Sequence, residues 1–151
     1  MTGLRKFCTE VLSPLLIRPP QVQVAALCYR ERDAAIEVLL ITSRRSGRWI
    51  LPKGWPIDGM NAAEAARQEA WEEAGVRSGA LSHRSVGVFD YEKRCAEGYV
   101  MPVRTHVYKL RADEVCDDFP EAHERLRRWV SSQEAANLVV EPQLQDILRA
   151  V

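Results

Sequence analysis

The sequence has 151 residues, enough for one domain with an apolar core of its own. Apolar residues make up 46% of the chain and charged residues 28%, a balance typical of globular proteins and unlike that of disordered chains. Basic and acidic residues are equal in number, so the formal net charge is zero. No overall field therefore indicates a nucleic acid polymer or a membrane surface as partner, and any anion-binding patch must be local.

The N-terminal region and the cysteines favour a soluble, cytoplasmic protein. The apolar stretch from Phe7 to Ile17 faintly resembles a signal peptide, but Glu10 and Pro14 interrupt it. No apolar run approaches the roughly 20 residues that a membrane span needs. The cysteines are far apart, without CxxC or Cys/His spacing, and we expect reduced thiols at all four positions: Cys8, Cys28, Cys95 and Cys116.

The first part of the chain predicts an N-terminal arm, residues 1–20, followed by a β-hairpin. Alternating apolar and polar residues over 21–29 predict one strand, and the apolar run 36–42 predicts a second strand that pairs with it. A short strand is expected at 49–51. The loop between the strands at 36–42 and 49–51 contains Arg44, Arg45 and Arg48. On composition alone, this loop is either a solvated turn or an anion site.

A helix is predicted from Ala62, because Asn61 is a favourable N-cap and Glu64 completes a capping box. Gly75 is placed to end the helix in the left-handed conformation. One face of this helix consists of small side chains that would let it lie close against a sheet: Ala63, Ala66, Ala70 and Ala74.

Three carboxylates share the neighbouring face of the same helix. Glu69, Glu72 and Glu73 stand at i, i+3 and i+4, within an arc of roughly 100°. Like charges so close repel one another by a few tenths of a kcal/mol per pair on an exposed helix. They form either a solvated acidic face or, with a cation held between them, a metal site.

The second half predicts three more strands, at 85–91, 100–110 and 125–130, with polar loops at 92–98 and 111–124. The long middle strand carries, on one face and in alternation, Arg104, His106 and Tyr108. This face could line an anion site or simply be exposed.

Two helices are expected at the end of the chain. Ser131 and Glu134 predict a capping box for the first. Pro142 suits the first turn of the second, with Leu144, Ile147 and Leu148 facing inward. The order of elements fits one α/β unit with a mixed sheet between helices.

The stretch from Gly54 to Val76 closely resembles the Nudix box, G-x5-E-x7-R-E-U-x-E-E-x-G-U with U apolar. The matching positions are Gly54, Glu69, Ala70, Glu72, Glu73, Gly75 and Val76. Two positions depart from the pattern, since Met60 stands where the family has its first glutamate and Gln68 where it has arginine. An arginine there would hold Glu72 by an ion pair, whereas glutamine can only donate a hydrogen bond.

The resemblance implies a Nudix-type α/β/α sandwich over residues 21–151, a single domain. It implies Mg²⁺ or Mn²⁺ bound by Glu69, Glu73 and Glu72, with Glu72 as general base or holder of the metal-bound water. Family members differ in which glutamate is the base. Mg²⁺ suits carboxylate oxygens and retains waters and substrate phosphates as further ligands.

The segments RWILPKGW and WVSSQEA are similar to those of the diphosphoinositol-polyphosphate and diadenosine-polyphosphate phosphohydrolase branch. This similarity implies hydrolysis of phosphoanhydride bonds in a small phosphorylated substrate, by a monomer or homodimer. The residues expected to contact that substrate are Arg44, Arg45, Arg48, Lys53, Gly54, Trp55, Arg104 and His106. Two alternatives remain open: an ADP-ribose or nucleotide-sugar pyrophosphatase, and a catalytically weak Nudix-like nucleotide-binding module.

Overall fold

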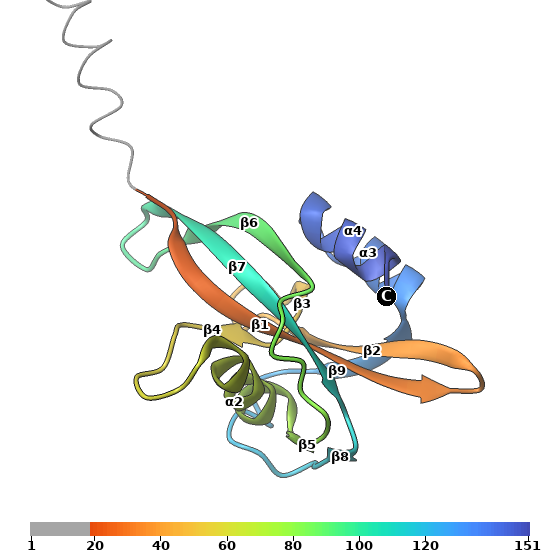
Figure 1. The fold of residues 1–151 in the computed structure, drawn as a ribbon. Helices are drawn as coiled ribbons and strands as arrows, with labels where there is room; N and C mark the ends of the chain where they lie inside the picture. The colour runs from red at the N-terminus through yellow and green to blue at the C-terminus, as the bar shows by residue number, and fades with distance from the viewer. Residues whose placement is uncertain (1–18) are drawn as a thin grey trace, which may run out of the picture.

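The computed structural model describes residues 19–151 (Figure 1). The predicted N-terminal arm and Cys8 fall almost wholly outside these residues. The three other cysteines, Cys28, Cys95 and Cys116, are free thiols, as predicted. Within the described part of the chain, no helix has the length and apolar character to cross a bilayer.

A seven-stranded mixed sheet forms the centre of the fold. Its main path runs β3-β2-β1-β7-β6, with β4 pairing β1 and β9 pairing β2. Strands β1 and β7 are parallel, and every other described pair in this sheet is antiparallel. The strands are β1 (Gln21–Arg32), β2 (Ala35–Thr42), β3 (Trp49–Ile50), β4 (Lys53–Gly54), β6 (Gly87–Arg94), β7 (Val100–Arg111) and β9 (Arg127–Ser131).

Helices cover the two faces of this sheet (Figure 1). The helix α2 (Ala62–Ala74) packs on one face, and α3 (Ser132–Leu138) and α4 (Pro142–Arg149) pack on the other. Alternate residues of β1 point into the two resulting cores, since Val24 and Ala26 join the first and Ala25 and Leu27 the second. The predicted α/β/α sandwich with a mixed sheet is confirmed.

The β1–β2 hairpin extends further than the sequence pattern indicated. Its turn consists of Asp33 and Ala34, both with positive φ (53° and 62°), and Arg32 pairs with Ala35 across it. Two central residues of this conformation match the twist of the flanking strands, so the ladder continues to the turn. The predicted strands at 21–29 and 36–42 are therefore parts of longer ones.

The predicted ends of α2 are confirmed. The Asn61 side chain accepts a hydrogen bond from the Glu64 N–H, and the Glu64 carboxylate accepts one from the Asn61 N–H. Gly75 ends the helix with φ 75°. The four alanines of the predicted packing face are at most 2% exposed: Ala63, Ala66, Ala70 and Ala74.

Two loops of the second half differ from the predictions. Strand β6 continues to Arg94, so the expected loop at 92–98 begins later; the ladder with β7 runs to Arg94 paired with Val100. The expected loop at 111–124 contains a short strand, β8 (Glu114–Val115), paired with β5 (Val76–Ser78).

The capping box predicted for α3 is only half formed. The Ser131 hydroxyl accepts from the Glu134 N–H, but the Glu134 carboxylate accepts instead from Arg128 Nη2 at 2.8 Å. An arginine in reach outcompetes the backbone N–H for this carboxylate, because a charge-assisted hydrogen bond is the stronger one.

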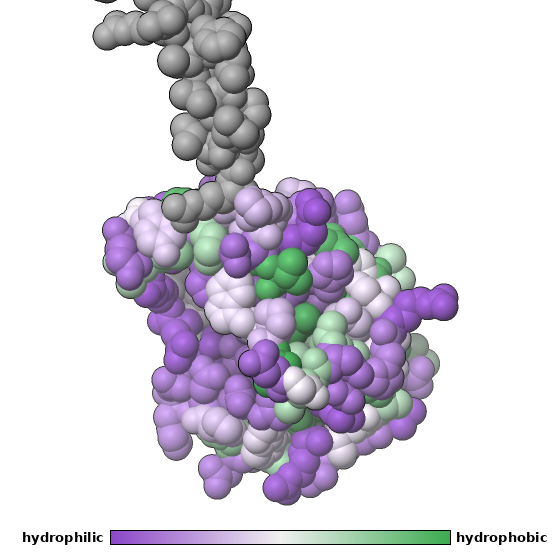
Figure 2. All heavy atoms as spheres, turned by 60° about the vertical axis from the view of Figure 1, so that its left-hand side comes forward, coloured by the Kyte–Doolittle hydropathy of each residue, from purple (hydrophilic) through white to green (hydrophobic). Residues whose placement is uncertain are grey.

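Apolar patches are small and separated by hydrophilic side chains on the face shown in Figure 2. This agrees with the ordinary globular composition of the chain.

Candidate active site

A broad cleft of about 1230 Å³ lies beside α2. Its walls come from α2, from the loop between β2 and β3, from β4 and the loop after it, and from the end of β6 with the following turn. It brings together the three box carboxylates with most of the predicted substrate contacts: Arg44, Arg45, Arg48, Lys53, Gly54 and Trp55. An acidic helix face and a basic loop thus share one cavity.

Glu73 is the most buried of the three carboxylates, at 6% exposure. Its Oε2 accepts from the Lys53 backbone N–H at 3.0 Å, and its Oε1 accepts from Arg125 Nη2 at 2.9 Å. Burial raises the pKa of Glu73 to about 6, although the adjacent Arg125 opposes this shift. The carboxylate is held from both sides in a fixed orientation.

Glu72 lies one position earlier and is only partly buried. Gln68 Nε2 donates to Glu72 Oε1 at 3.0 Å, across one turn of α2. The prediction that Gln68 contacts Glu72 through a hydrogen bond is confirmed. Glu72 Oε2 has no hydrogen bond among the described residues, so this oxygen is available to a ligand or a proton.

Glu69 packs directly against the loop backbone at Gly54. A Cβ at position 54 would overlap the Glu69 carboxylate, so only glycine permits this approach. Burial, together with like-charge repulsion from the neighbouring Glu73 and Glu72, raises the pKa of Glu69 to about 7. A site with this excess of negative charge is stabilised by a cation.

The donor set fits a hard divalent cation in kind. All three carboxylates offer oxygen ligands, and Glu69 makes no hydrogen bond or ion pair among the described residues. In the described part of the chain, however, no three His, Cys, Asp or Glu side chains are gathered closely enough to coordinate an ion. Rotation of these side chains would be needed to bring their oxygens together around one ion.

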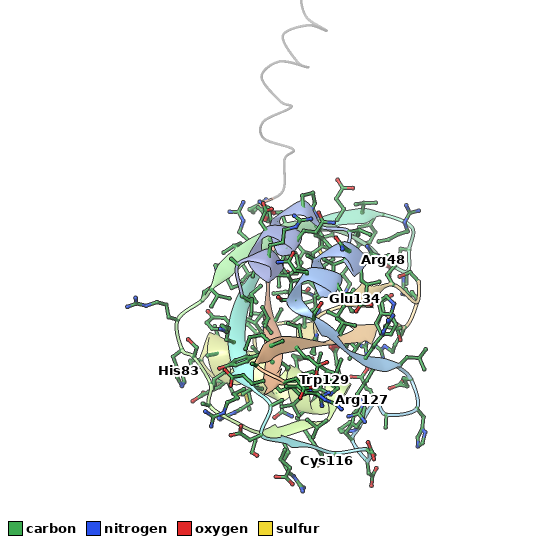
Figure 3. All side chains as sticks on the ribbon, turned by 90° about the vertical axis from the view of Figure 1, so that its right-hand side faces the viewer. Arg48, His83, Cys116, Arg127, Trp129 and Glu134 are labelled. Carbon is green, nitrogen blue, oxygen red and sulfur yellow. The ribbon has the colours of Figure 1, made fainter. Side chains whose placement is uncertain are left out.

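The three loop arginines differ in how their charge is balanced. Arg44 lies near Glu121 (3.3 Å) and Glu124 (3.5 Å). Arg48 lies 3.6 Å from Glu141, at the end of the molecule near α3 and α4 (Figure 3).

Arg45 has no carboxylate within ion-pair distance among the described residues, and its Nη1 donates to the Arg94 carbonyl at 3.4 Å. Its charge is therefore the most available of the three to an anionic ligand.

Two cationic side chains lie against aromatic rings in the cleft. Lys53 Nζ is 5.1 Å from the centre of the Tyr91 ring, and Lys93 Nζ is 5.1 Å from that of Trp55. Burial lowers the pKa of Lys53 to about 8, although Glu73 opposes this shift. Trp55 is 40% exposed, which leaves part of its ring open to a ligand.

Arg104 and His106 are not among the residues that line this cleft. Arg104 is exposed and forms an ion pair with Asp90 at 2.9 Å. His106 lines a separate, mainly apolar pocket of about 320 Å³, together with Met60 and Tyr108. The structure therefore does not bring these two predicted contacts together with the three carboxylates, although the pocket of His106 also touches the start of α2.

Several cleft residues were missed by sequence reasoning. Lys93 and Arg94 lay in a segment read as a polar loop, and Glu121 in another. Arg125 is the most deeply placed, with a side chain 5% exposed. Nothing in the local pattern separates it from Arg127 and Arg128, because its partner Glu73 is 52 residues away.

The α/β/α sandwich thus carries a cleft in which the Gly54 loop contacts the acidic face of α2. Basic side chains line the same cleft. The model of the NUDIX domain matches residues 19–151. The chain belongs to the Nudix family.

Similar curated proteins carry Nudix names. Nudix hydrolase 21, chloroplastic, of Arabidopsis thaliana is 37% identical over 117 residues, covering 76% of this chain and 56% of that protein. Nudix hydrolase 12, mitochondrial, of the same plant is 34% identical over 110 residues, 68% and 52% of the two chains. Human diphosphoinositol polyphosphate phosphohydrolase 2 is 30% identical over 119 residues, 78% and 61%. The chain thus spans between about half and three fifths of the length of these relatives.

Solved structures share the fold. An Ap4A hydrolase of C. elegans superimposes with a TM-score of 0.60 at 23% identity, covering 87% of this chain and 95% of that one. The NUDIX domain of Shewanella oneidensis NrtR, complexed with ADP ribose, gives 0.64 at 18% identity, with 94% and 95% coverage. At these identities the likeness establishes the fold alone.

Proposed function

We propose that this protein is a Mg²⁺- or Mn²⁺-dependent hydrolase of phosphoanhydride bonds in a highly phosphorylated small molecule, either a dinucleoside polyphosphate or a diphosphoinositol polyphosphate. The observation that carries the proposal is the placement of Glu69, Glu72 and Glu73 in the same cleft as the arginine loop. Phosphoryl chemistry needs both a carboxylate-held cation and positive side chains for the phosphates.

Glu69, Glu72 and Glu73 would hold the cation, which when bound shields phosphate charge and acidifies the attacking water. Gly54 lets the Glu69 carboxylate lie against the loop, and the Lys53 N–H fixes Glu73. Glu72 is the proposed general base, because one oxygen is oriented by Gln68 and the other is left to accept the proton.

The basic residues favour a substrate with several phosphates. Arg44, Arg45, Arg48 and Lys53 line the cleft, and Lys93 and Arg94 at the end of β6 add further positive charge to it. The exposed Trp55 offers a ring surface to a base. Arg104 and His106 remain predicted contacts, but their positions outside the cleft would require a substrate that extends beyond it.

A panel assay tests the proposal. Product release is measured from dinucleoside polyphosphates, diphosphoinositol polyphosphates and ADP-ribose with Mg²⁺, with Mn²⁺ and with EDTA. We expect turnover with metal on one of the first two classes, abolished by EDTA and lowered by about 100-fold or more in Glu72→Gln. Glu64→Gln, on the same helix and compatible with its capping box, should stay near wild type.

Preference for ADP-ribose would replace this proposal by the pyrophosphatase alternative. Tight binding without metal-dependent turnover would favour a nucleotide-binding module. The proposal also includes a single domain at 21–151 that follows an N-terminal arm. It further includes a monomeric or dimeric state and a cytoplasmic location. Size-exclusion chromatography with light scattering checks the oligomeric state.

A further inference from the structure

Arg125 joins three separate parts of the chain beneath the cleft. Its Nη2 donates to Glu73 Oε1 at 2.9 Å and to Glu121 Oε1 at 3.2 Å, and its Nη1 donates to the Thr42 carbonyl at 3.0 Å. Thr42 ends β2, Glu73 belongs to α2, and Glu121 belongs to the segment before β9. The same guanidinium thus contacts a box carboxylate and a carboxylate from outside the box.

Glu121 is attached to the metal-site helix a second time, through its backbone. The Glu121 N–H donates to the Glu72 carbonyl at 3.0 Å, and the Glu121 side chain lines the cleft. The position of Glu121 relative to Glu73 is therefore set by one backbone bond and by the Arg125 bridge. Arg44 lies 3.3 Å from Glu121, but its side chain is 58% exposed, so it is not part of this buried unit.

The Arg125 bridge is not arranged for stability alone. Its Nε is buried and has no hydrogen-bond partner among residues 19–151, a defect that costs about 1–3 kcal/mol. Buried ion pairs are also poor sources of net stability, because desolvation offsets their attraction. A buried arginine that adds little net stability but contacts a candidate metal ligand indicates a role in orienting that ligand.

We infer that Arg125 is a positioning residue for the metal site, which holds Glu73 and Glu121 in the orientation that binds the cation. The Nudix box has an arginine at the position of Gln68, and this chain therefore lacks that arginine contact to Glu72. Arg125 would supply an arginine contact from outside the box, but to Glu73. This inference rests on the proposed metal-dependent function.

Arg127 provides a matched control. It comes from β9 and points towards the Cys116 segment (Figure 3), where its Nη1 donates to the carbonyls of Ala74 and Cys116. It ties the same segment to the end of the same helix but contacts none of the cleft carboxylates. Loss of Arg127 should therefore reproduce the structural effect of losing Arg125 without its effect on the metal site.

The test is the Mn²⁺ dissociation constant of the full chain, measured by electron paramagnetic resonance of free Mn²⁺, for wild type, Arg125→Met, Arg125→Lys and Arg127→Met. We expect Arg125→Met to weaken binding by about tenfold, as loss of a residue that orients a metal ligand does. Arg125→Lys should recover part of this, since an ammonium can reach one carboxylate. Arg127→Met should stay within about twofold of wild type, whatever its melting temperature.

The direction in which the Mn²⁺ dissociation constant changes distinguishes a role of Arg125 in orienting ligands from a purely electrostatic effect of its charge. If Arg125 acted only as a nearby positive charge, its removal would tighten cation binding. Unchanged or tighter binding in Arg125→Met, or equal weakening in Arg127→Met, overturns the inference. If Arg125→Met does not fold, Arg125→Lys decides by the same criterion. Failure of the wild type itself to bind Mn²⁺ would instead reject the proposed function.

Discussion

The two helical layers of the sandwich pack against the sheet in different ways. On one side, α2 buries five alanines and the charged Glu73. On the other, α4 buries Leu144 and Leu148, at most 1% exposed. Large apolar side chains contribute about 1.5–3 kcal/mol each by burial, whereas alanine contributes much less. The α4 side thus stabilises the fold, while the α2 side brings a charged helix close to the sheet.

The largest expected effect is on the α4 side. Leu148→Ala leaves a cavity in a fully buried position and should lower the free energy of unfolding by about 3 kcal/mol. Urea denaturation measures this change, with Leu126→Ala, at 69% exposure, as a control of under about 0.5 kcal/mol. Turnover per folded molecule should be unchanged. A large loss of turnover in Leu148→Ala would show that the two layers do not have separate roles.

On the α2 side, Gly54→Ala should give the opposite pattern. The new Cβ would displace the Glu69 carboxylate, which is the flexible end of a side chain, so the stability should change little. Turnover should fall by about 100-fold, equivalent to about 2.7 kcal/mol, because a misplaced ligand disrupts the site.

Gly59→Ala is the control for Gly54→Ala. Its φ of 83° strains an alanine, but no atom of the part of the chain that the structure describes lies within 4 Å of the added Cβ. It should cost about 1 kcal/mol of stability and leave turnover near wild type. Equal losses of turnover in both variants would argue against a specific role for Gly54.

The sequence predicts contacts between residues that are close in the chain better than contacts between distant residues. The hairpin, the caps of α2, its alanine face and the Gln68–Glu72 contact could be predicted, because each depends on residues close together in the chain. The Arg125–Glu73 pair joins residues 52 positions apart, and no periodicity encodes it.

The strand β7 illustrates a second limit. Alternation placed Arg104, His106 and Tyr108 on one face, and Tyr108 does join the core beneath α2. Alternation does not say how far along the strand the cleft extends, and Arg104 and His106 lie outside it. The positions of side chains along a face depend on the register of neighbouring strands, here β1 and β6, which the pattern does not specify.

The charge gathered on α2 should make the metal-free protein sensitive to pH. The pKa of Glu69 is raised from 4.5 to about 7 in the folded state. Between these values the folded state binds more protons than the unfolded state, so stability falls as the pH rises through this window. Because Glu69 is half-exposed, we expect Glu69→Gln to be more stable than wild type by only about 1 kcal/mol at pH 8.

The difference between Glu69→Gln and wild type should vanish below about pH 4.5, where the carboxyl is protonated in both states. Urea denaturation in EDTA at pH 8 and below pH 4.5 measures it, with the exposed Glu97→Gln as control. Added Mg²⁺ should reduce or reverse the advantage at pH 8, because the ion binds the charged form. A difference independent of pH would contradict a raised pKa of Glu69 in the folded state.

The smallest expected effect concerns the orientation of Glu72. Gln68→Met keeps the length of the side chain but removes the donor to Glu72 Oε1, a hydrogen bond that is worth about 0.5–1.5 kcal/mol. If the bond orients Glu72 for proton transfer, kcat should fall by about threefold to tenfold while KM stays unchanged, because substrate binding does not involve this contact. Gln68→Glu tests the sign, since a second carboxylate would repel Glu72 and should lower kcat further. An unchanged kcat in Gln68→Met would mean that Glu72 is oriented by the substrate or the cation and that the α2 helix only carries it.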